Sequence, residues 1–274
     1  MRGLLNVQFA ISAGVLYVIE ANPRASRTVP FVSKALGIPL AKAAARVMSG
    51  TSIADLKAEG LLPVADGSRV PLDAPVAVKE AVLPFKRFRT KEGHIVDSVL
   101  GPEMRSTGEV MGIDRDFPTA FAKSQEAAYG GMPLSGTVFI SVADADKRAV
   151  ILPAHRLQEL GFELIATEGT AEILARNGIR VRVVNKYSAT QESGETNIVD
   201  LINAGEIDMI VNTPSGGLAR ADGYEIRAAA VAADKALFTT MAVLGAAVSA
   251  LGVLGEGFEV RSLQEYAVDR AARL

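Results

Sequence analysis

From Thr137 onward, short apolar runs alternate with amphipathic stretches of helical length. Such alternation is typical of strands that are buried on both faces and joined by crossover helices. The pattern predicts strands at 137–142, 163–166, 181–185, 208–212 and 236–239, and helices at 144–160, 170–177, 197–204, 224–235 and 241–251. We therefore expect an α/β fold in this half of the chain, with a doubly wound, mainly parallel sheet.

The residues before Thr137 follow a different pattern. Apolar residues alternate over 5–21 around a turn at Ser12-Ala13-Gly14, which predicts a β-hairpin. A helix-rich stretch is expected at 29–48, a loop at 60–75, a strand at 77–84 and a helix at 117–128. Turn-forming residues at 129–133 suggest a boundary between two domains, 1–130 and 131–274.

Composition restricts the class of protein. Hydrophobic residues make up 49% of the 274 residues and charged residues 22%, with a net charge of −2, which predicts a soluble protein without a nucleic-acid or membrane partner. The absence of Cys excludes disulfides and thiolate metal sites and is compatible with the cytoplasm. The uncharged stretch 236–255 is interpreted as a buried strand and helix, and the apolar start of the chain as strands rather than a leader peptide.

A polar group follows from the spacing within the expected hairpin. Glu20 and Asn22 are two residues apart on a strand, so their side chains share one face, and Gln8 is expected nearly opposite Glu20. Three oxygen donors on one face suit Mg²⁺, and Arg24 and Arg27 suit phosphate oxygens. The alternative is the ordinary polar outer face of a hairpin.

The run Ile19–Lys34, IEANPRASRTVPFVSK, together with NVQFA at 6–10, resembles the end of an ATP-grasp domain, in particular the second one in the large subunit of carbamoyl phosphate synthetase. The run GPEMRSTGEVMG at 101–112 is similar to a later motif of that family, and the resemblance extends along essentially the whole chain. It implies ATP-dependent formation of carbamoyl phosphate for arginine and pyrimidine biosynthesis, with Gln8, Glu20 and Asn22 binding Mg²⁺ or Mn²⁺ and Arg24 serving catalysis at the phosphates.

The resemblance also implies partners and a missing part. The parent enzyme contains the rest of the large subunit and a glutaminase small subunit. No Gly-rich phosphate loop precedes residue 5, so we expect this chain to be a fragment that makes no carbamoyl phosphate alone. Glu80 and Thr239 match positions that bind ornithine in regulated members, but Leu237 stands where the family has Tyr, which makes ornithine control doubtful.

A second group of polar residues follows the strands of the expected parallel sheet. Ligands bind beyond the carboxyl ends of such strands, where helices begin. The residues at these ends are Ser141, Thr167, Thr170, Lys186, Asn212 and Thr213. Lys147 is expected in the first turn or so of the helix after Ser141, and Asp222 comes soon after Thr213. Helix capping explains any single member, whereas the combined set with two lysines favours a phosphate or nucleotide site.

This half of the chain resembles the methylglyoxal-synthase-like regulatory domain of the same family. The resemblance implies that these eight residues bind a nucleotide monophosphate such as UMP or IMP, with Pro214 replacing the usual Thr. Two alternatives stay open. One is a lyase like methylglyoxal synthase, which lacks support because no Gly-Asp-Gln-Gln run follows the Gly-Gly turn. The other is an assembly module that forms a homo-oligomer through the C-terminal domain.

Overall fold

The computed structural model describes residues 1–65, 73–101, 103–190, 195–214, 219–255 and 257–271. The chain forms two compact units. The first comprises 1–77, 113–116 and 259–274, and the second comprises 78–112 and 117–258. The predicted boundary near residue 130 lies inside the second unit, because the helix just before it packs against the C-terminal region. The assignment of functional domains to 1–130 and 131–274 stays a prediction.

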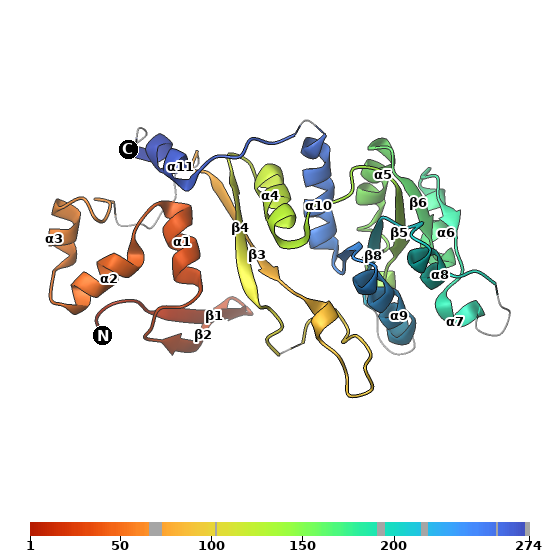
Figure 1. The fold of residues 1–274 in the computed structure, drawn as a ribbon, viewed down its shortest axis with the longest axis horizontal. Helices are drawn as coiled ribbons and strands as arrows, with labels where there is room; N and C mark the ends of the chain where they lie inside the picture. The colour runs from red at the N-terminus through yellow and green to blue at the C-terminus, as the bar shows by residue number, and fades with distance from the viewer. Residues whose placement is uncertain (66–72, 102, 191–194, 215–218, 256, 272–274) are drawn as a thin grey trace. The chain divides into compact units, whose positions relative to one another are not determined.

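The first unit begins with the expected hairpin, formed by β1 (Asn6–Ser12) and β2 (Val15–Asn22) (Figure 1). Ala13 and Gly14 both have positive φ, at 48° and 77°, as a tight two-residue turn requires. The helices are α1 (Thr28–Leu36), α2 (Leu40–Met48), α3 (Ile53–Ala58) and α11 (Leu263–Ala271). The helix-rich stretch expected at 29–48 consists of two helices, α1 and α2, because Gly37 adopts a left-handed conformation that ends α1.

The second unit contains a five-stranded parallel sheet in the order β7-β6-β5-β8-β9. Its strands are β5 (Thr137–Ser141), β6 (Glu163–Ala166), β7 (Arg182–Val183), β8 (Met209–Asn212) and β9 (Ala236–Phe238). β5 lies at the centre, with β6 and β8 on either side. The predicted α/β fold with a doubly wound parallel sheet is therefore confirmed.

Alternation along the inner strands supplies apolar side chains to both faces of this sheet. Val138 and Ile140 belong to one buried cluster, whereas Phe139 between them belongs to another. The first cluster includes residues of α4 (Phe117–Tyr129), α5 (Ile151–Glu159), α6 (Glu168–Arg176) and α10 (Met241–Leu254). The second includes residues of α8 (Ile198–Asn203) and α9 (Ala219–Ala232), so helices cover the sheet on both sides (Figure 1).

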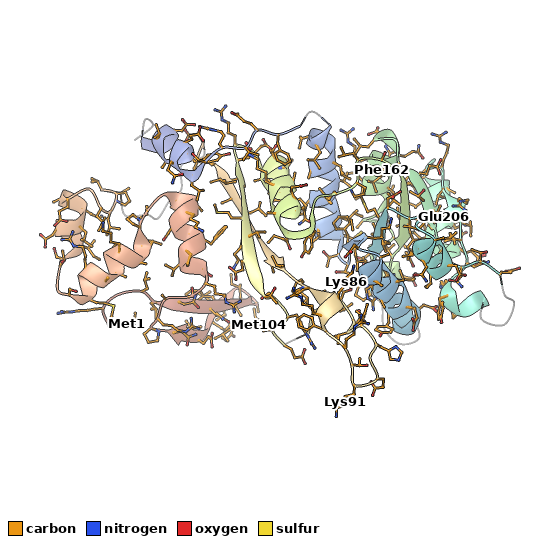
Figure 2. The ribbon with its side chains drawn as sticks, viewed as in Figure 1. Met1, Lys86, Lys91, Met104, Phe162 and Glu206 are labelled. Carbon is orange, nitrogen blue, oxygen red and sulfur yellow. The ribbon has the colours of Figure 1, made fainter. Side chains whose placement is uncertain are left out.

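Two regions of the second unit lie outside the sheet. β3 (Val76–Val82) pairs with β4 (Gly108–Asp114), and the connection between them contains η1 (Phe85–Arg87). Lys91 lies near the tip of this connection in Figure 2. Lys86 forms an ion pair with Asp234, just beyond the end of α9. The short helix α7 (Tyr187–Thr190) follows β7.

Two expectations about the second half need comment. The helix expected at 144–160 is wrong in its first part, where η2 (Asp144–Asp146) is followed by turns before α5 begins at Ile151. The uncharged stretch 236–255 forms β9 and α10, as the sequence predicts. Among the helices in the described ranges, none combines the length and apolar character needed to span a membrane.

Candidate functional site

The predicted metal ligands lie together on the hairpin of the first unit. Gln8 and Glu20 are direct partners across the two strands, as expected. A register shift after Gln8 leaves Ile19 as an extra residue, so that the next pair is Phe9 and Val18. The Asn22 Nδ2 group donates a 2.8 Å hydrogen bond to Glu20 Oε1, which confirms that these two side chains share a face.

The chemistry of this group fits a hard divalent cation. The Asn22 amide nitrogen is turned toward Glu20, which leaves its Oδ1 atom available beside the carboxylate and the Gln8 amide. Gln8 and Glu20 are exposed, and no group of three His, Cys, Asp or Glu side chains that could hold a metal occurs in the described part of the chain. Arg24 is exposed and donates to the Ala25 carbonyl oxygen at 3.3 Å.

The apolar side chains of the same hairpin are also exposed. Ile11 is 77% exposed, Ile19 65%, Val18 61% and Phe9 56%. Single exposed apolar residues are common on protein surfaces, but here several lie close together on paired strands, with Phe9 opposite Val18, which favours an interaction surface. The hairpin of these 274 residues therefore presents an apolar surface with three oxygen donors at one end.

The second predicted group gathers at the carboxyl edge of the parallel sheet. Ser141 at the end of β5 is paired with Asn212 at the end of β8. The Thr167 hydroxyl donates to Ser141 Oγ at 3.2 Å, and the Thr213 amide donates to the Ser141 carbonyl oxygen at 3.2 Å. Four of the predicted residues are buried polar side chains at this edge: Thr167, Thr170, Asn212 and Thr213.

Hydrogen bonds to backbone amides fix two of these threonines. The Thr170 hydroxyl accepts a 3.4 Å hydrogen bond from the Val142 amide. The Thr213 hydroxyl accepts a 2.8 Å hydrogen bond from the Ala143 amide. Thr167 is the N-cap residue of α6, yet its side chain makes no capping hydrogen bond, because it is directed to Ser141 instead. Capping therefore does not explain the presence of Thr167.

Lys147 approaches the start of α6, although it lies in the turn after η2 and not in a helix, which corrects the sequence prediction. Its Nζ atom is 3.2 Å from the position that a Cβ atom on Gly169 would occupy. It also forms a 2.7 Å ion pair with Asp144. The pKa of Asp144 is lowered, first by the hydrogen bond from Lys147 and then by the charge of Lys147, with a smaller contribution from the charge of Lys186.

Asp222 lies in α9 and is engaged by α7. Its carboxylate accepts hydrogen bonds from the Ser188 amide at 3.0 Å and from the Ser188 hydroxyl at 2.8 Å. Asp144 and Ser188 were not predicted from the sequence. Arg227 was also missed: it is 1% exposed and its Nη1 group donates to Asn212 Oδ1 at 2.7 Å. The only sequence signal for it is an arginine among the buried positions Ile226, Ala229 and Ala230.

The two residues predicted for an ornithine-type effector lie in different surroundings. Glu80 on β3 accepts a 3.0 Å hydrogen bond from Gln125 and a 3.4 Å one from the Tyr129 hydroxyl. Burial raises the pKa of Glu80 despite these hydrogen bonds, and burial together with the Glu80 charge raises the pKa of Tyr129. Thr239 follows β9, and within the described residues no hydrogen bond joins it to Glu80.

Two known protein families match different parts of the chain. Residues 1–56 match the family described as the carbamoyl-phosphate synthase L chain, ATP binding domain. Residues 149–239 match the MGS-like domain. The first match contains the hairpin with the three oxygen donors, and the second contains most of the polar edge of the sheet.

Individual relatives are similar over the full length of the chain. The carbamoyl phosphate synthase large chain of Clavibacter michiganensis subsp. michiganensis is 76% identical over 274 residues, which are 100% of this chain and 25% of that protein. The large chain of Kineococcus radiotolerans is 67% identical, covering 97% of this chain and 25% of its own length. That of Streptomyces coelicolor is 60% identical, with 97% and 24% covered. The chain spans about a quarter of the length of these curated relatives.

Proposed function

We propose that this chain carries the regulatory, nucleotide-binding part of a carbamoyl phosphate synthase large chain, because it is 76% and 75% identical over its full length to two such chains and matches the ATP-binding and MGS-like domain families. In the proposal the carboxyl edge of the parallel sheet binds the phosphate of a nucleotide monophosphate such as UMP or IMP. The hairpin contributes the metal-binding edge of an ATP site that other parts of a large chain complete.

The start of α6 is the observation that carries the nucleotide proposal. The amides of Glu168 and Gly169 have no hydrogen-bond partner among the described residues, and the helix dipole favours an anion at this end. Lys147 supplies a cation within reach of Gly169. The start of α6 therefore combines two free backbone amides, an N-cap Thr167 whose hydroxyl does not cap the helix, and a nearby lysine. This combination suits phosphate oxygens.

The remaining residues of the set have roles that follow from their chemistry. Lys186 adds a second positive charge to the set. A bound anion would partly replace Asp144 as the partner of Lys147. Asp222 suits ribose hydroxyls rather than phosphate, because a carboxylate repels an anion and accepts hydrogen bonds. Ser141, Thr170, Asn212 and Thr213 shape the polar floor. The sequence change at Pro214 removes one hydroxyl and one N–H from this region.

Calorimetric titration of the 274-residue chain with UMP and with IMP tests this proposal. We expect binding of at least one of them, and we expect Lys147→Gln and Lys186→Gln each to weaken it about tenfold, the effect of one charge-assisted hydrogen bond. Lys91→Gln is the matched control, because it removes the same charge at the exposed tip of the β3–β4 connection. Equal affinity in all four proteins, or no binding by any, would reject the nucleotide site and favour an assembly module.

For the hairpin we propose that Gln8, Glu20 and Asn22 hold Mg²⁺ or Mn²⁺ in the assembled enzyme. Such an ion bridges nucleotide phosphates and neutralises charge during phosphoryl transfer. Arg24 is placed two residues after Asn22 and would bind phosphate oxygens of ATP. The apolar surface of the hairpin is proposed to pack against the rest of the large chain. In this proposal the parent enzyme also contains a glutaminase small subunit and acts in the cytoplasm.

We further propose that the 274 residues alone do not make carbamoyl phosphate. Phosphoryl transfer needs many groups that grip the nucleotide together, and no Gly-rich phosphate loop occurs in this sequence before the hairpin. A coupled assay with ATP, bicarbonate and ammonia is expected to show no turnover above a Glu20→Gln control. Measurable turnover that depends on Glu20 would contradict this. Conversion of dihydroxyacetone phosphate to methylglyoxal is likewise expected to be undetectable.

A further inference from the structure

Arg227 is the fully buried cation of the second unit that the proposed function does not yet use. Its side chain has no exposed surface, and it lies on α9 behind the edge of the sheet where the proposed nucleotide binds. A buried charge is costly unless it is paired and hydrogen-bonded. The partners of Arg227 therefore reveal what its position serves.

These partners come from two places that are far apart in the sequence. The Nε and Nη2 groups of Arg227 donate to the two carboxylate oxygens of Asp97 at 2.7 and 2.6 Å. This two-point geometry fixes the plane of the guanidinium group. Its remaining edge points to Asn212, where Nη1 donates to Oδ1 at 2.7 Å. Asp97 thus holds Arg227, and Arg227 holds Asn212.

The consequence for Asn212 is that its side chain has only hydrogen-bond donor capacity left for a ligand. Its oxygen is occupied by Arg227, and its nitrogen lies 3.4 Å from the Ser141 carbonyl oxygen. An amide nitrogen carries two N–H groups, so one remains for a ligand, and the oxygen cannot turn to face the ligand without breaking the bond to a buried cation. Asn212 is therefore fixed as a donor and recognises only an acceptor.

A glycine at position 223 makes room for this arrangement. A Cβ atom on Gly223 would lie 2.5 Å from Arg227 Nη1 and 3.2 Å from Asn212 Oδ1. The φ of Gly223 is not in the left-handed region, so backbone conformation does not require glycine there. Glycine is needed at position 223 because a larger side chain would occupy the space of the Arg227–Asn212 hydrogen bond.

We propose that Arg227 is a positioning residue that locks Asn212 as a hydrogen-bond donor, so that the site selects ligands with an anionic phosphate group over the same ligands without it. The inference rests on the proposed nucleotide site and specifies how Asn212 distinguishes between ligands at that site. Asp97 serves as the counter-ion that makes the buried arginine tolerable.

The test compares the affinities of UMP and uridine for the chain by calorimetric titration. Arg227→Met combined with Asp97→Asn removes the donor and its counter-charge together, so that no uncompensated charge stays buried. We expect this double variant to keep the helical circular dichroism of the unmodified chain. We expect its affinity for UMP to fall about threefold to tenfold, the size of one hydrogen bond, while its affinity for uridine changes less. A purely structural role would change the two affinities by the same factor.

Gly223→Ala provides a second, independent variant that leaves every charge in place. Its methyl group would displace the Arg227 guanidinium, and we expect the same preferential loss of UMP affinity. Gly245→Ala in α10 is the matched control, because a Cβ atom there meets nothing within 4 Å. An unchanged ratio of UMP to uridine affinity in both Gly223→Ala and the double variant would overturn the inference alone. Failure of the unmodified chain to bind UMP would reject the proposed function, and this inference with it.

Discussion

Gly112 shows how one residue position determines packing in the second unit. A Cβ atom there would lie 1.9 Å from the Ala120 carbonyl oxygen and 2.6 Å from the Ser124 amide nitrogen, both in α4. These are backbone atoms, so the strand and the helix would have to separate to admit any side chain. The glycine is needed for a close approach, and its neighbours in the sequence do not reveal this.

We expect Gly112→Ala to lower the free energy of unfolding by about 1–3 kcal/mol, the usual cost of overpacking. Gly245→Ala, which has open space, is expected to be neutral or stabilising by about 0.5–1 kcal/mol because alanine favours helix. Urea denaturation followed by circular dichroism measures both. Equal stabilities for the two variants would show that β4 and α4 do not approach so closely.

Protonation of Glu80 is expected to change the free energy of unfolding with pH. Burial raises its pKa in the folded chain above the ordinary value of 4.5. The folded state then holds the proton over a pH range in which the unfolded state has released it, so this residue's contribution to stability falls as pH rises from 4.5 through the raised pKa.

Glu80→Gln removes this titration and keeps a side chain that can hydrogen-bond to Gln125 and Tyr129. We expect the stability difference between the variant and the unmodified chain to shift in favour of the variant as pH increases from 4 to about 7. Thermal unfolding at several pH values measures it. A difference that is constant with pH, or that shifts in the opposite direction, would mean that burial does not control Glu80.

At the scale of elements, the exposed hairpin leads to a prediction about association. Its apolar side chains stay accessible in these 274 residues, and such surfaces drive self-association. We expect Ile11→Thr with Val18→Thr to reduce oligomers in size-exclusion chromatography with light scattering, because threonine keeps the strand propensity while removing apolar surface. Val260→Thr, at an exposed position that is not part of the hairpin, is the control. Association that persists unchanged would place the contact elsewhere.

Local pattern was sufficient to predict several elements but not their long-range contacts. The two-residue period predicts the hairpin and the pairing of Gln8 with Glu20, and the strand–helix alternation predicts the parallel sheet. The break at Gly37 and the position of Lys147 outside a helix depend on how the chain turns, which propensity does not fix. Arg227 could not be assigned because its partner Asp97 is 130 residues away in the sequence.

At the scale of the whole molecule, the two groups of polar residues differ in how complete they are. The hairpin group is exposed and depends on neighbours that these 274 residues do not supply in our proposal. At the sheet edge, Thr167, Thr170, Asn212 and Thr213 are buried, Thr167 is hydrogen-bonded to Ser141, and Lys147 adds a positive charge beside Gly169. We therefore expect ligand binding by the chain alone to be located in the second unit.

Hydrogen–deuterium exchange with and without millimolar UMP tests this central claim most directly. The account predicts slower exchange in peptides covering 141–147, 167–170 and 212–214, with the largest effect at the amides of Glu168 and Gly169, and no change over the hairpin at 6–22. Protection confined to the hairpin, or no protection anywhere at saturating UMP, would contradict it.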